Sequence, residues 1–296
     1  MIDFVIVGAS KCGTTALASH LSQCDKVFVS VPKEPKYFTY KFLKNKYKGP
    51  GDDYTLKKCV KTLSEYKKLF SKAPENVIKG EASVDMLYYH EEVVPELKSC
   101  IGDPKIIIML REPSARAFSA YKHMVRDGRE DKSFEEGLLL ERERMSNGYE
   151  FIWSYKQESM YYSGVEHYLN NFSHVKVIIF EDFISNQEKT VNDTLSFLGV
   201  NNSEPIKIKE AIINKSGKPK SKLIHNFFAT DNIIKTFFKK ILKENSKAKI
   251  KNYIFSKNLK NISSDNVLLD NLRMDFKNEN AKLEKLLNIN LDKWKN

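Results

Sequence analysis

The first twenty residues predict a strand, a glycine-bounded turn and a helix in direct succession. The run Phe4 to Val7 is apolar and rich in β-branched residues, as in a strand that is buried on both faces. Gly8 and Gly13 bound a turn of small residues, and the chain from Thr14 onward has a helical apolar pattern. Free N–H groups and the positive end of the helix dipole converge at such a junction. We therefore expect an α/β fold with an anion site at its first strand–helix junction.

The spacing of Gly8 and Gly13 is similar to that of a Walker A loop, but the basic residue stands elsewhere. A Walker A loop places Lys and then Ser or Thr directly after its second glycine. Here Thr14 takes that position, and the lysine lies inside the loop as Lys11. Thr15 could still reach a magnesium ion. We expect a phosphate cradle that does not serve an ordinary nucleoside triphosphate, and the alternative is a turn without a ligand.

Short apolar runs predict a sheet of about five strands. They cover residues 3–8, 26–31, 77–81, 105–110 and 175–180. Helical patterns lie between and after them, and the clearest cover residues 86–97, 159–172 and 268–294. This alternation is typical of a three-layer α/β domain with a parallel sheet. We expect one domain over residues 1–296, with an α/β core over 1–204 and a basic loop and helical cover over 205–296.

Charged residues follow two of the predicted strands, at the edge where a parallel sheet gathers functional groups. Glu34 follows the second strand. It could act as a general base, or it could pair with Lys33 or Lys36. Arg111 follows the fourth strand.

Arg111 and Ser119 together predict a phosphate clamp. An arginine offers a bidentate fork, and a serine adds a hydroxyl donor. The spacing of Ser119 and His123 places both on one face of the predicted helix. The alternative is an Arg111 that is paired with Glu112 or Glu81.

The net charge of +11 is concentrated in the last third of the chain. Residues 1–204 carry 28 Lys and Arg against 29 Asp and Glu, whereas residues 205–296 carry 21 against 9. Such a surface suits an anionic cofactor, an acidic glycan, an anionic membrane or nucleic acid, or is simply solvated. Residues 214–222 form a basic loop that could close over a polyanion. Residues 223–256 form a basic amphipathic stretch that either packs on the domain or lies on a membrane.

Cysteine spacing and hydropathy argue against several classes of protein. The four cysteines are widely separated and form no CxxC pair, which favours free thiols in a reducing compartment over a zinc site. No apolar run reaches ~18 residues, so we expect no transmembrane helix. The chain begins directly with a core-type strand and without the basic start of a signal peptide. We expect a cytoplasmic protein that uses no metal.

Three blocks of residues carry a resemblance to a known family. They are Lys11-Cys12-Gly13-Thr14-Thr15, Arg111-x-Pro113-x-x-Arg116-x-x-Ser119-x-Tyr121 and Lys33-Glu34-x-x-x-Phe38. In this order they resemble the blocks of sulfotransferases that use 3′-phosphoadenosine 5′-phosphosulfate (PAPS), in the carbohydrate, heparan-sulfate-like and bacterial branch. Residues 214–222 and the ending from Leu283 to Trp294 give weaker support. The resemblance covers essentially the whole chain and implies a P-loop-like strand order.

The resemblance implies a role for each block. Lys11 would stabilise the leaving group, and Glu34 would take the proton of the acceptor; these are the two expected catalytic residues. The residues that would hold the nucleotide are Lys11, Cys12, Gly13, Thr14, Thr15, Arg111, Ser119, Ser216, Gly217, Lys218 and Lys220. Lysines and backbone amides would neutralise the phosphates, so the resemblance implies no metal.

The identity of the acceptor stays open at this stage. The residues expected near it are Lys33, Lys36, Ser83 and His123. The basic tail and the resemblance suggest an anionic polysaccharide or oligosaccharide, and lipid, small-molecule and peptide acceptors stay open. Nucleic acid is not expected, and peripheral membrane contact is open. Two other functions compete with sulfuryl transfer. One is a P-loop kinase that uses Gly8–Thr15 and Glu181–Asp182, and the other is a non-enzymatic binder of acidic polymers.

Overall fold

The computed structural model describes residues 2–200, 206, 208, 218–219, 259–260 and 266–295, with the backbone alone for 218–219 and 259–260. A parallel sheet of five strands lies at its centre. The strands are β1 (Phe4–Gly8), β2 (Val27–Val29), β3 (Ile78–Ala82), β4 (Lys105–Leu110) and β5 (Val175–Ile179). Their spatial order is β2-β3-β1-β4-β5. This confirms the expected parallel sheet and places the glycine turn after β1 at its middle.

The central strands are buried because each has a strand on both sides and helices over both faces. All five residues of β1 are buried. Phe4 of β1 lies opposite Gly80 of β3 and Lys105 of β4. A Cβ atom on Gly80 would lie 2.3 Å from the ring of Phe4, so this close approach of strand and ring requires a glycine.

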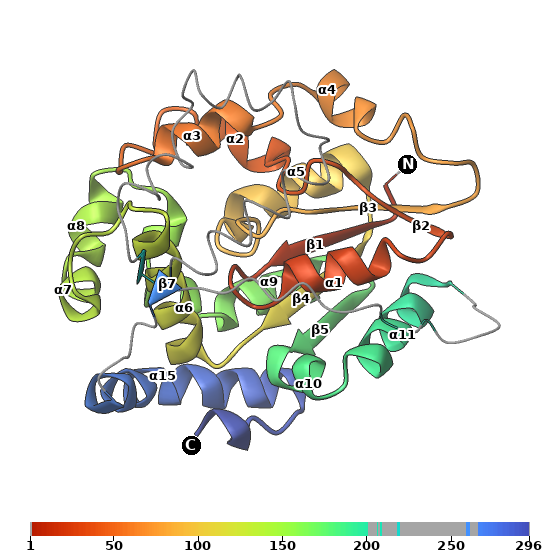
Figure 1. Ribbon diagram of the computed structural model, residues 1–296. Helices are drawn as coiled ribbons and strands as arrows, with labels where there is room; N and C mark the ends of the chain where they lie inside the picture. The colour runs from red at the N-terminus through yellow and green to blue at the C-terminus, as the bar shows by residue number, and fades with distance from the viewer. Residues whose placement is uncertain are drawn as a thin grey trace.

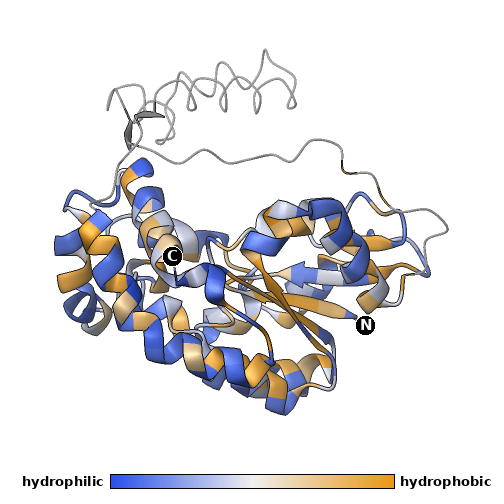
Figure 2. Ribbon diagram, turned by 90° about the horizontal axis from the view of Figure 1, so that it is seen from below, coloured by the Kyte–Doolittle hydropathy of each residue, from blue (hydrophilic) through white to orange (hydrophobic). Residues whose placement is uncertain are grey.

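Helices cover both faces of the sheet (Figure 1). One face carries α1 (Thr14–Leu21) and α11 (Gln187–Leu198), and the other carries α5 (His90–Ile101) and α9 (Tyr162–Asn171). Hydrophobic strands lie between helices that carry many hydrophilic residues (Figure 2). The expected three-layer α/β arrangement is therefore confirmed. The predicted helix over residues 86–97 begins later, at His90, because the chain first makes turns after β3.

The remaining helices of the first 200 residues lie in the longer connections. They are α2 (Tyr37–Leu43), α3 (Asp52–Lys58), α4 (Leu63–Lys68), α6 (Pro113–Arg126), α7 (Phe134–Leu139), α8 (Glu141–Ser146) and α10 (Phe180–Ser185). Pro113 begins α6 as expected, and the carboxylate of Glu112 accepts hydrogen bonds from the N–H groups of Ser114 and Ala115 at 2.9 and 2.7 Å. This side-chain cap explains why the helix begins at this residue.

The C-terminal segment packs on the core as a helical cover. Helix α15 (Asn266–Leu287) lies against α6 and α9, and the short 3₁₀ helix η3 (Asp292–Trp294) follows. The single helix expected over 268–294 is therefore interrupted, and Asn288 has a left-handed φ of 51° there. The buried indole of Trp294 donates to Glu181 Oε2 at 3.0 Å. In the described part of the chain, no helix has the length and apolarity needed to cross a membrane.

Candidate functional site

The carboxyl ends of four neighbouring strands bring the predicted residues to one edge of the sheet. Lys11 follows β1, Glu34 follows β2, Ser83 follows β3 and Arg111 follows β4. Because β3, β1 and β4 are adjacent, the turn after β1 lies between the other two segments. Open α/β sheets bind their ligands at this edge.

The turn after β1 presents the start of α1. Lys11 and Gly13 have left-handed φ angles of 64° and 90°. A Cβ atom on Gly13 would lie 2.9 Å from the ring of Phe180, so both conformation and space call for glycine there. Thr14 is buried, whereas Thr15 is exposed in the first turn of the helix. Among the residues that the structure describes, no side chain caps this helix start, which leaves its N–H groups available to an anion.

Lys11 lies within a group of cations. Burial and the charges of Arg126 and Arg111 together lower the pKa of Lys11 to about 8, while Asp127 opposes them. Burial and the charge of Arg111 also lower the pKa of Lys122. Arg111 thus lowers the pKa of both lysines, and the carboxylate beside them, Asp127, pairs with Arg126 at 2.8 Å. A polyanion bound among these cations would favour the charged forms of the lysines.

Arg111 joins the end of β4 to the turn after β1. Its Nη1 donates to the carbonyl oxygen of Lys11 at 3.4 Å, and its guanidinium lies 4.7 Å from the centre of the Phe180 ring. Neither alternative partner holds it. Glu112 caps α6, and Glu81 accepts from Tyr66 and Ser83. Among the described residues, Arg111 has no carboxylate partner.

His123 lies beside this group of cations. Its Nδ1 accepts from Arg126 Nη2 at 2.6 Å, and its Nε2 lies 3.6 Å from Asp127 Oδ2. Burial and the charge of Lys11 lower the pKa of His123 to about 3, so the ring is neutral at pH 7. The sequence analysis missed Arg126, although it stands one helical turn after His123 on α6.

Cys12 and Arg116 turn into the protein rather than toward the open edge. The thiol of Cys12 donates to the carbonyl of Ser10 at 3.4 Å, and burial raises its pKa to about 12. Only the backbone of Cys12 remains for a ligand. Arg116 is completely buried, forms an ion pair with Glu158 at 2.5 Å and donates to Ser10 Oγ at 3.4 Å. It therefore supports the turn from beneath. Ser119, on the same helix, is also buried.

Glu34 lies on the loop after β2 with a left-handed φ of 61°. Its N–H donates to the carbonyl of Ala82 at 2.9 Å, and its Oε2 accepts from the N–H of Val84 at 3.0 Å. Its Oε1 pairs with Lys33, and 27% of its side chain is exposed. The carboxylate is thus held in place by backbone but remains open to solvent, as a proton acceptor requires.

Lys36 and Ser83 are buried behind Glu34. The ammonium of Lys36 lies 3.3 Å from Glu150 and 3.6 Å from Asp85. Burial acts to lower the pKa of Lys36, but these two carboxylates raise it above its ordinary value. Ser83 Oγ donates to Glu81 at 2.9 Å. Contact of Lys36 and Ser83 with an acceptor stays a prediction, and in this structure both already have protein partners.

Glu181 and Asp182, the acidic pair that a kinase would need, are bonded to other protein groups. Glu181 accepts from the N–H of Glu112 at 3.1 Å and from the indole of Trp294. Asp182 pairs with Lys293. Both carboxylates therefore tie the C-terminal cover to the core. Within the described ranges, no cluster of three or more His, Cys, Asp or Glu could hold a metal ion.

Part of the predicted nucleotide site lies outside the described residues. Ser216, Gly217 and Lys220 belong to that part, as does the amphipathic stretch over 223–256. Lys218 is described by its backbone in the short strand β6 (Lys218–Pro219), which pairs antiparallel with β7 (Leu259–Lys260) and lies beside α6. The main chain at Lys218 thus lies next to the helix that carries Ser119 and His123.

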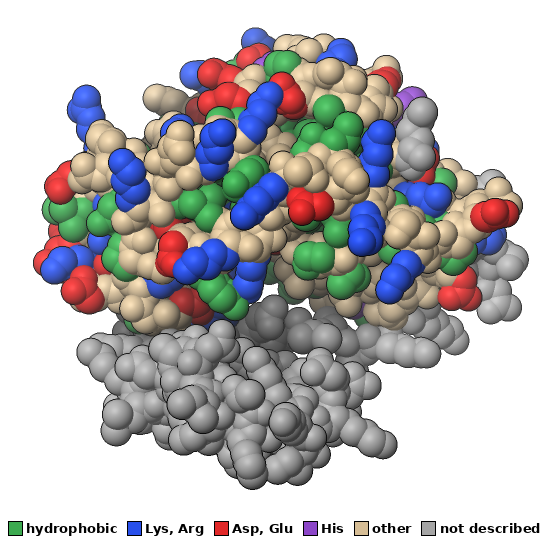
Figure 3. All heavy atoms as spheres, turned by 90° about the horizontal axis from the view of Figure 1, so that it is seen from above, with side chains coloured by type: hydrophobic (Ala, Val, Ile, Leu, Met, Phe, Trp, Pro, Cys, Tyr) green, Lys and Arg blue, Asp and Glu red, His purple; other side chains and the backbone are tan. Residues whose placement is uncertain are grey.

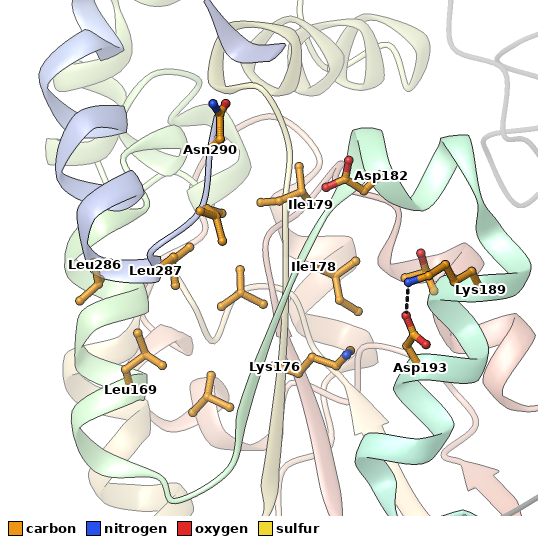
Figure 4. A pocket seen from close by; sticks show the side chains of 14 residues that line it. Leu169, Lys176, Ile178, Ile179, Asp182, Lys189, Asp193, Leu286, Leu287 and Asn290 are labelled. Atoms are coloured by element: carbon orange, nitrogen blue, oxygen red, sulfur yellow. Dashed lines mark hydrogen bonds and ion pairs between the residues drawn. The ribbon is translucent and has the colours of Figure 1, made fainter. Parts of the chain in front are cut away.

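A hollow of about 600 Å³ lies away from this edge (Figure 4). It is bounded by β5, by α11 with its Lys189–Asp193 pair at 2.9 Å, and by the end of α15 at Leu286 and Leu287. Its lining includes Asp182, from the acidic pair of the kinase alternative, but none of the residues predicted to hold the nucleotide or the acceptor. The hollow follows the exposed edge strand rather than the strand ends, and we assign it no role.

Comparison with known proteins identifies the class. A model described as the sulfotransferase family matches residues 3–204, so the chain belongs to the sulfotransferase family. The chain is similar to a sulfotransferase crystal structure from Alicyclobacillus acidocaldarius, with 30% identity, a TM-score of 0.79 and coverage of 100% of this chain and 99% of that one. A sulfotransferase domain from the curacin biosynthetic pathway covers 98% of both chains at 12% identity and a TM-score of 0.50, and shows the fold alone. No curated protein sequence matched.

Proposed function

We propose that this protein transfers a sulfuryl group from PAPS to a hydroxyl or amine of an acceptor. The observation that carries the proposal is the cluster of Lys11, Arg111 and Arg126 at the uncapped start of α1. Phosphate and sulfate groups at both ends of one nucleotide fit such a cluster, because they supply the negative charge that it lacks. Family membership supports the same reaction class.

Each residue has a defined task in the proposed reaction. When bound, PAPS supplies a sulfuryl group, whose bond to the phosphate oxygen breaks as the acceptor attacks the sulfur in line. Lys11 donates a hydrogen bond to that leaving oxygen, where negative charge grows. Preorganised donors of this kind contribute a few kcal/mol each. Glu34 takes the proton that the acceptor loses.

The second block of residues, from Arg111 to Tyr121, binds the 3′-phosphate end of the nucleotide. Arg111 and Ser119 hold the 3′-phosphate, a group that ATP lacks, and thereby select PAPS over ATP. Gly13, Thr14 and Thr15 offer backbone and hydroxyl donors to the 5′ end, and Cys12 offers its backbone alone. The main chain at Lys218 lies beside α6, and Lys218 contacts the nucleotide from that side.

We infer an acceptor that carries negative charge, with a carbohydrate as the favoured class. A groove of about 760 Å³ lies between β2 and helices α3 and α4, and its rim includes Lys57, Lys61, Lys68 and Lys72. The carboxylate of Glu65, which also lines it, accepts from the N–H groups of Lys61 and Thr62 in the capping box of α4. From the side of α2, α3 and α4, lysines stand among hydrophobic side chains (Figure 3).

The groove lies next to the loop that carries Glu34. Val60 lines the groove, and its N–H donates to the carbonyl of Pro35 at 2.8 Å. Val31, which is 80% exposed, lines it three residues before Glu34. An anionic acceptor held there would have its reactive group close to Glu34.

Sulfuryl transfer from radiolabelled PAPS tests the function directly. Acceptors for the screen include heparan-type glycans, neutral oligosaccharides, lipids and phenols. Lys11→Ala and Glu34→Gln should each remove most turnover, and Glu34→Gln should keep its affinity for 3′-phosphoadenosine 5′-phosphate (PAP). Near-full turnover in Glu34→Gln would refute the assignment of the base.

Thermal stabilisation separates the three candidate functions. A sulfotransferase should be stabilised most by PAP, a kinase by ATP with Mg²⁺, and a polymer binder by heparin in a way that survives Lys11→Ala. At equal concentration, the ligand that binds the folded state more tightly stabilises it more. A larger shift with ATP and Mg²⁺ than with PAP would overturn the proposal.

A further inference from the structure

Glu81 is a buried carboxylate directly behind the loop of Glu34. It lies between Gly80 and Ala82 in the buried half of β3 and has no exposed surface. Tyr66 of α4 donates to its Oε1 at 2.6 Å, and Ser83 donates to its Oε2 at 2.9 Å. Nothing in the proposed transfer reaction uses this group, yet burying a carboxylate is costly unless it has such partners.

The segment that Glu81 anchors is the one on which Glu34 rests. The N–H of Glu34 bonds to the carbonyl of Ala82, and the N–H of Val84 bonds to the Glu34 carboxylate. The N–H of Lys36 donates to Ser83 Oγ at 3.2 Å. Residues 82–84 therefore hold the loop of Glu34 through three hydrogen bonds, and Ser83 links one of them to Glu81.

We propose that Glu81 is a positioning residue for the transfer reaction. In its charged state it accepts from both Tyr66 and Ser83 and thereby holds residues 82–84, on which the carboxylate of Glu34 is aligned. A protonated Glu81 carries a donor on one oxygen, so it cannot accept both bonds in the same way. The proposal rests on the proposed function, because it takes Glu34 as the base.

The surroundings of Glu81 shift its protonation to near neutral pH. Burial raises the pKa of Glu81 to about 7; the hydrogen bonds from Tyr66 and Ser83 lower it, and the charges of Asp85 and Glu34 raise it. Tyr168 of α9 also faces Glu81. The main chain of Lys36 bonds to Ser83, and its ammonium is held by Asp85 and Glu150.

The test is the dependence of kcat/KM on pH, measured with PAPS and the best acceptor from the screen. Wild type should lose activity below about pH 7, in the window where Glu81 gains a proton. Glu81→Gln should show roughly tenfold lower kcat at pH 8 and should lack this acidic limb of the pH profile, that is, the loss of activity below about pH 7. It should bind PAP within about twofold of wild type. A limb that persists unchanged in Glu81→Gln would overturn the proposal.

Tyr66→Phe provides a second test should Glu81→Gln fail to fold. It keeps the carboxylate but removes a hydrogen bond that lowers the Glu81 pKa, so the limb should move to higher pH; an unmoved limb contradicts the proposal. Glu96→Gln, a carboxylate change at a surface ion pair with Lys41, should leave the profile unchanged. Absence of turnover in wild type at every pH would refute the proposed function, whereas turnover with an unaltered profile in both variants would refute the role of Glu81 alone.

Discussion

The guanidinium of Arg111 donates to the main-chain carbonyl of Lys11 at 3.4 Å, across one hundred positions of sequence. The two residues meet because β1 and β4 are neighbours in the sheet and end at the same edge. Phe180, which follows β5, contacts both sides of this junction: its ring lies beneath Arg111 and against Gly13. The distance between the two proposed phosphate-binding blocks is therefore set by the protein before any ligand binds.

Replacing Arg111 should weaken the binding of PAP. Hydrogen bonds to charged groups are worth about 1.5–3 kcal/mol, so Arg111→Ala should raise the dissociation constant roughly 10- to 100-fold, as measured by titration calorimetry. Arg111→Lys should not restore it, because a lysine lacks the planar fork and stacks poorly on Phe180. Lys156→Ala, at an exposed pair with Asp275, is the control. Unchanged affinity in Arg111→Ala would refute the 3′-phosphate assignment.

Binding of PAP should be coupled to proton uptake by Lys11. The pKa of Lys11 is lowered to about 8 in the free protein by burial and by its cationic neighbours. Bound phosphates favour the charged form and raise that pKa again, so affinity should fall as pH rises above about 8. Calorimetry at pH 8.5 in buffers of different ionisation enthalpy should show uptake of a fraction of a proton. Lys11→Arg, which does not titrate in this range, should abolish the uptake; the same uptake in this variant would contradict the prediction.

The buried pair of Arg116 and Glu158 should matter for stability rather than for ligand contact. Removal of one partner from a buried ion pair typically costs 3–5 kcal/mol. We expect Glu158→Gln to lower the free energy of unfolding by about that amount in denaturant titrations. The matched change Asp193→Asn, at the exposed pair with Lys189, should leave the unfolding midpoint nearly unchanged. Equal effects of the two changes would contradict the structural role of Arg116.

The contact between His90 and His167 should make stability depend on pH. Their Nδ1 atoms lie 2.8 Å apart, so one ring must be neutral to accept. Burial lowers the pKa of His90, and the charge of His167 lowers it further. Below the ordinary value of 6.5 the unfolded chain binds the proton more readily, so stability is lost as pH falls through this range. Wild type should lose more stability than His90→Gln between pH 7 and 5, and parallel curves would refute the coupling.

Local pattern was enough to place the strands and to select the residues at their ends. The apolar run before Gly8 and the runs ending near Glu81, Leu110 and Ile179 follow from side-chain chemistry over a few neighbours. The glycine turn with Lys11, and Arg111 at the end of a strand, likewise indicate anion binding from residue types and local order, whereas the role of Glu34 stays a prediction. For these features no distant partner has to be known.

The pairing and burial of charged side chains depend on residues that lie far apart in the chain. The burial of Arg116 depends on Glu158, the ion pairs of Lys36 depend on Glu150, and the group around Lys11 includes Arg126 from the end of α6. The spatial order of the strands likewise cannot be read from any one of them. Whether a charged side chain is paired, buried or open is a property of the packed molecule, because desolvation and Coulomb energies depend on distances that exist only after folding.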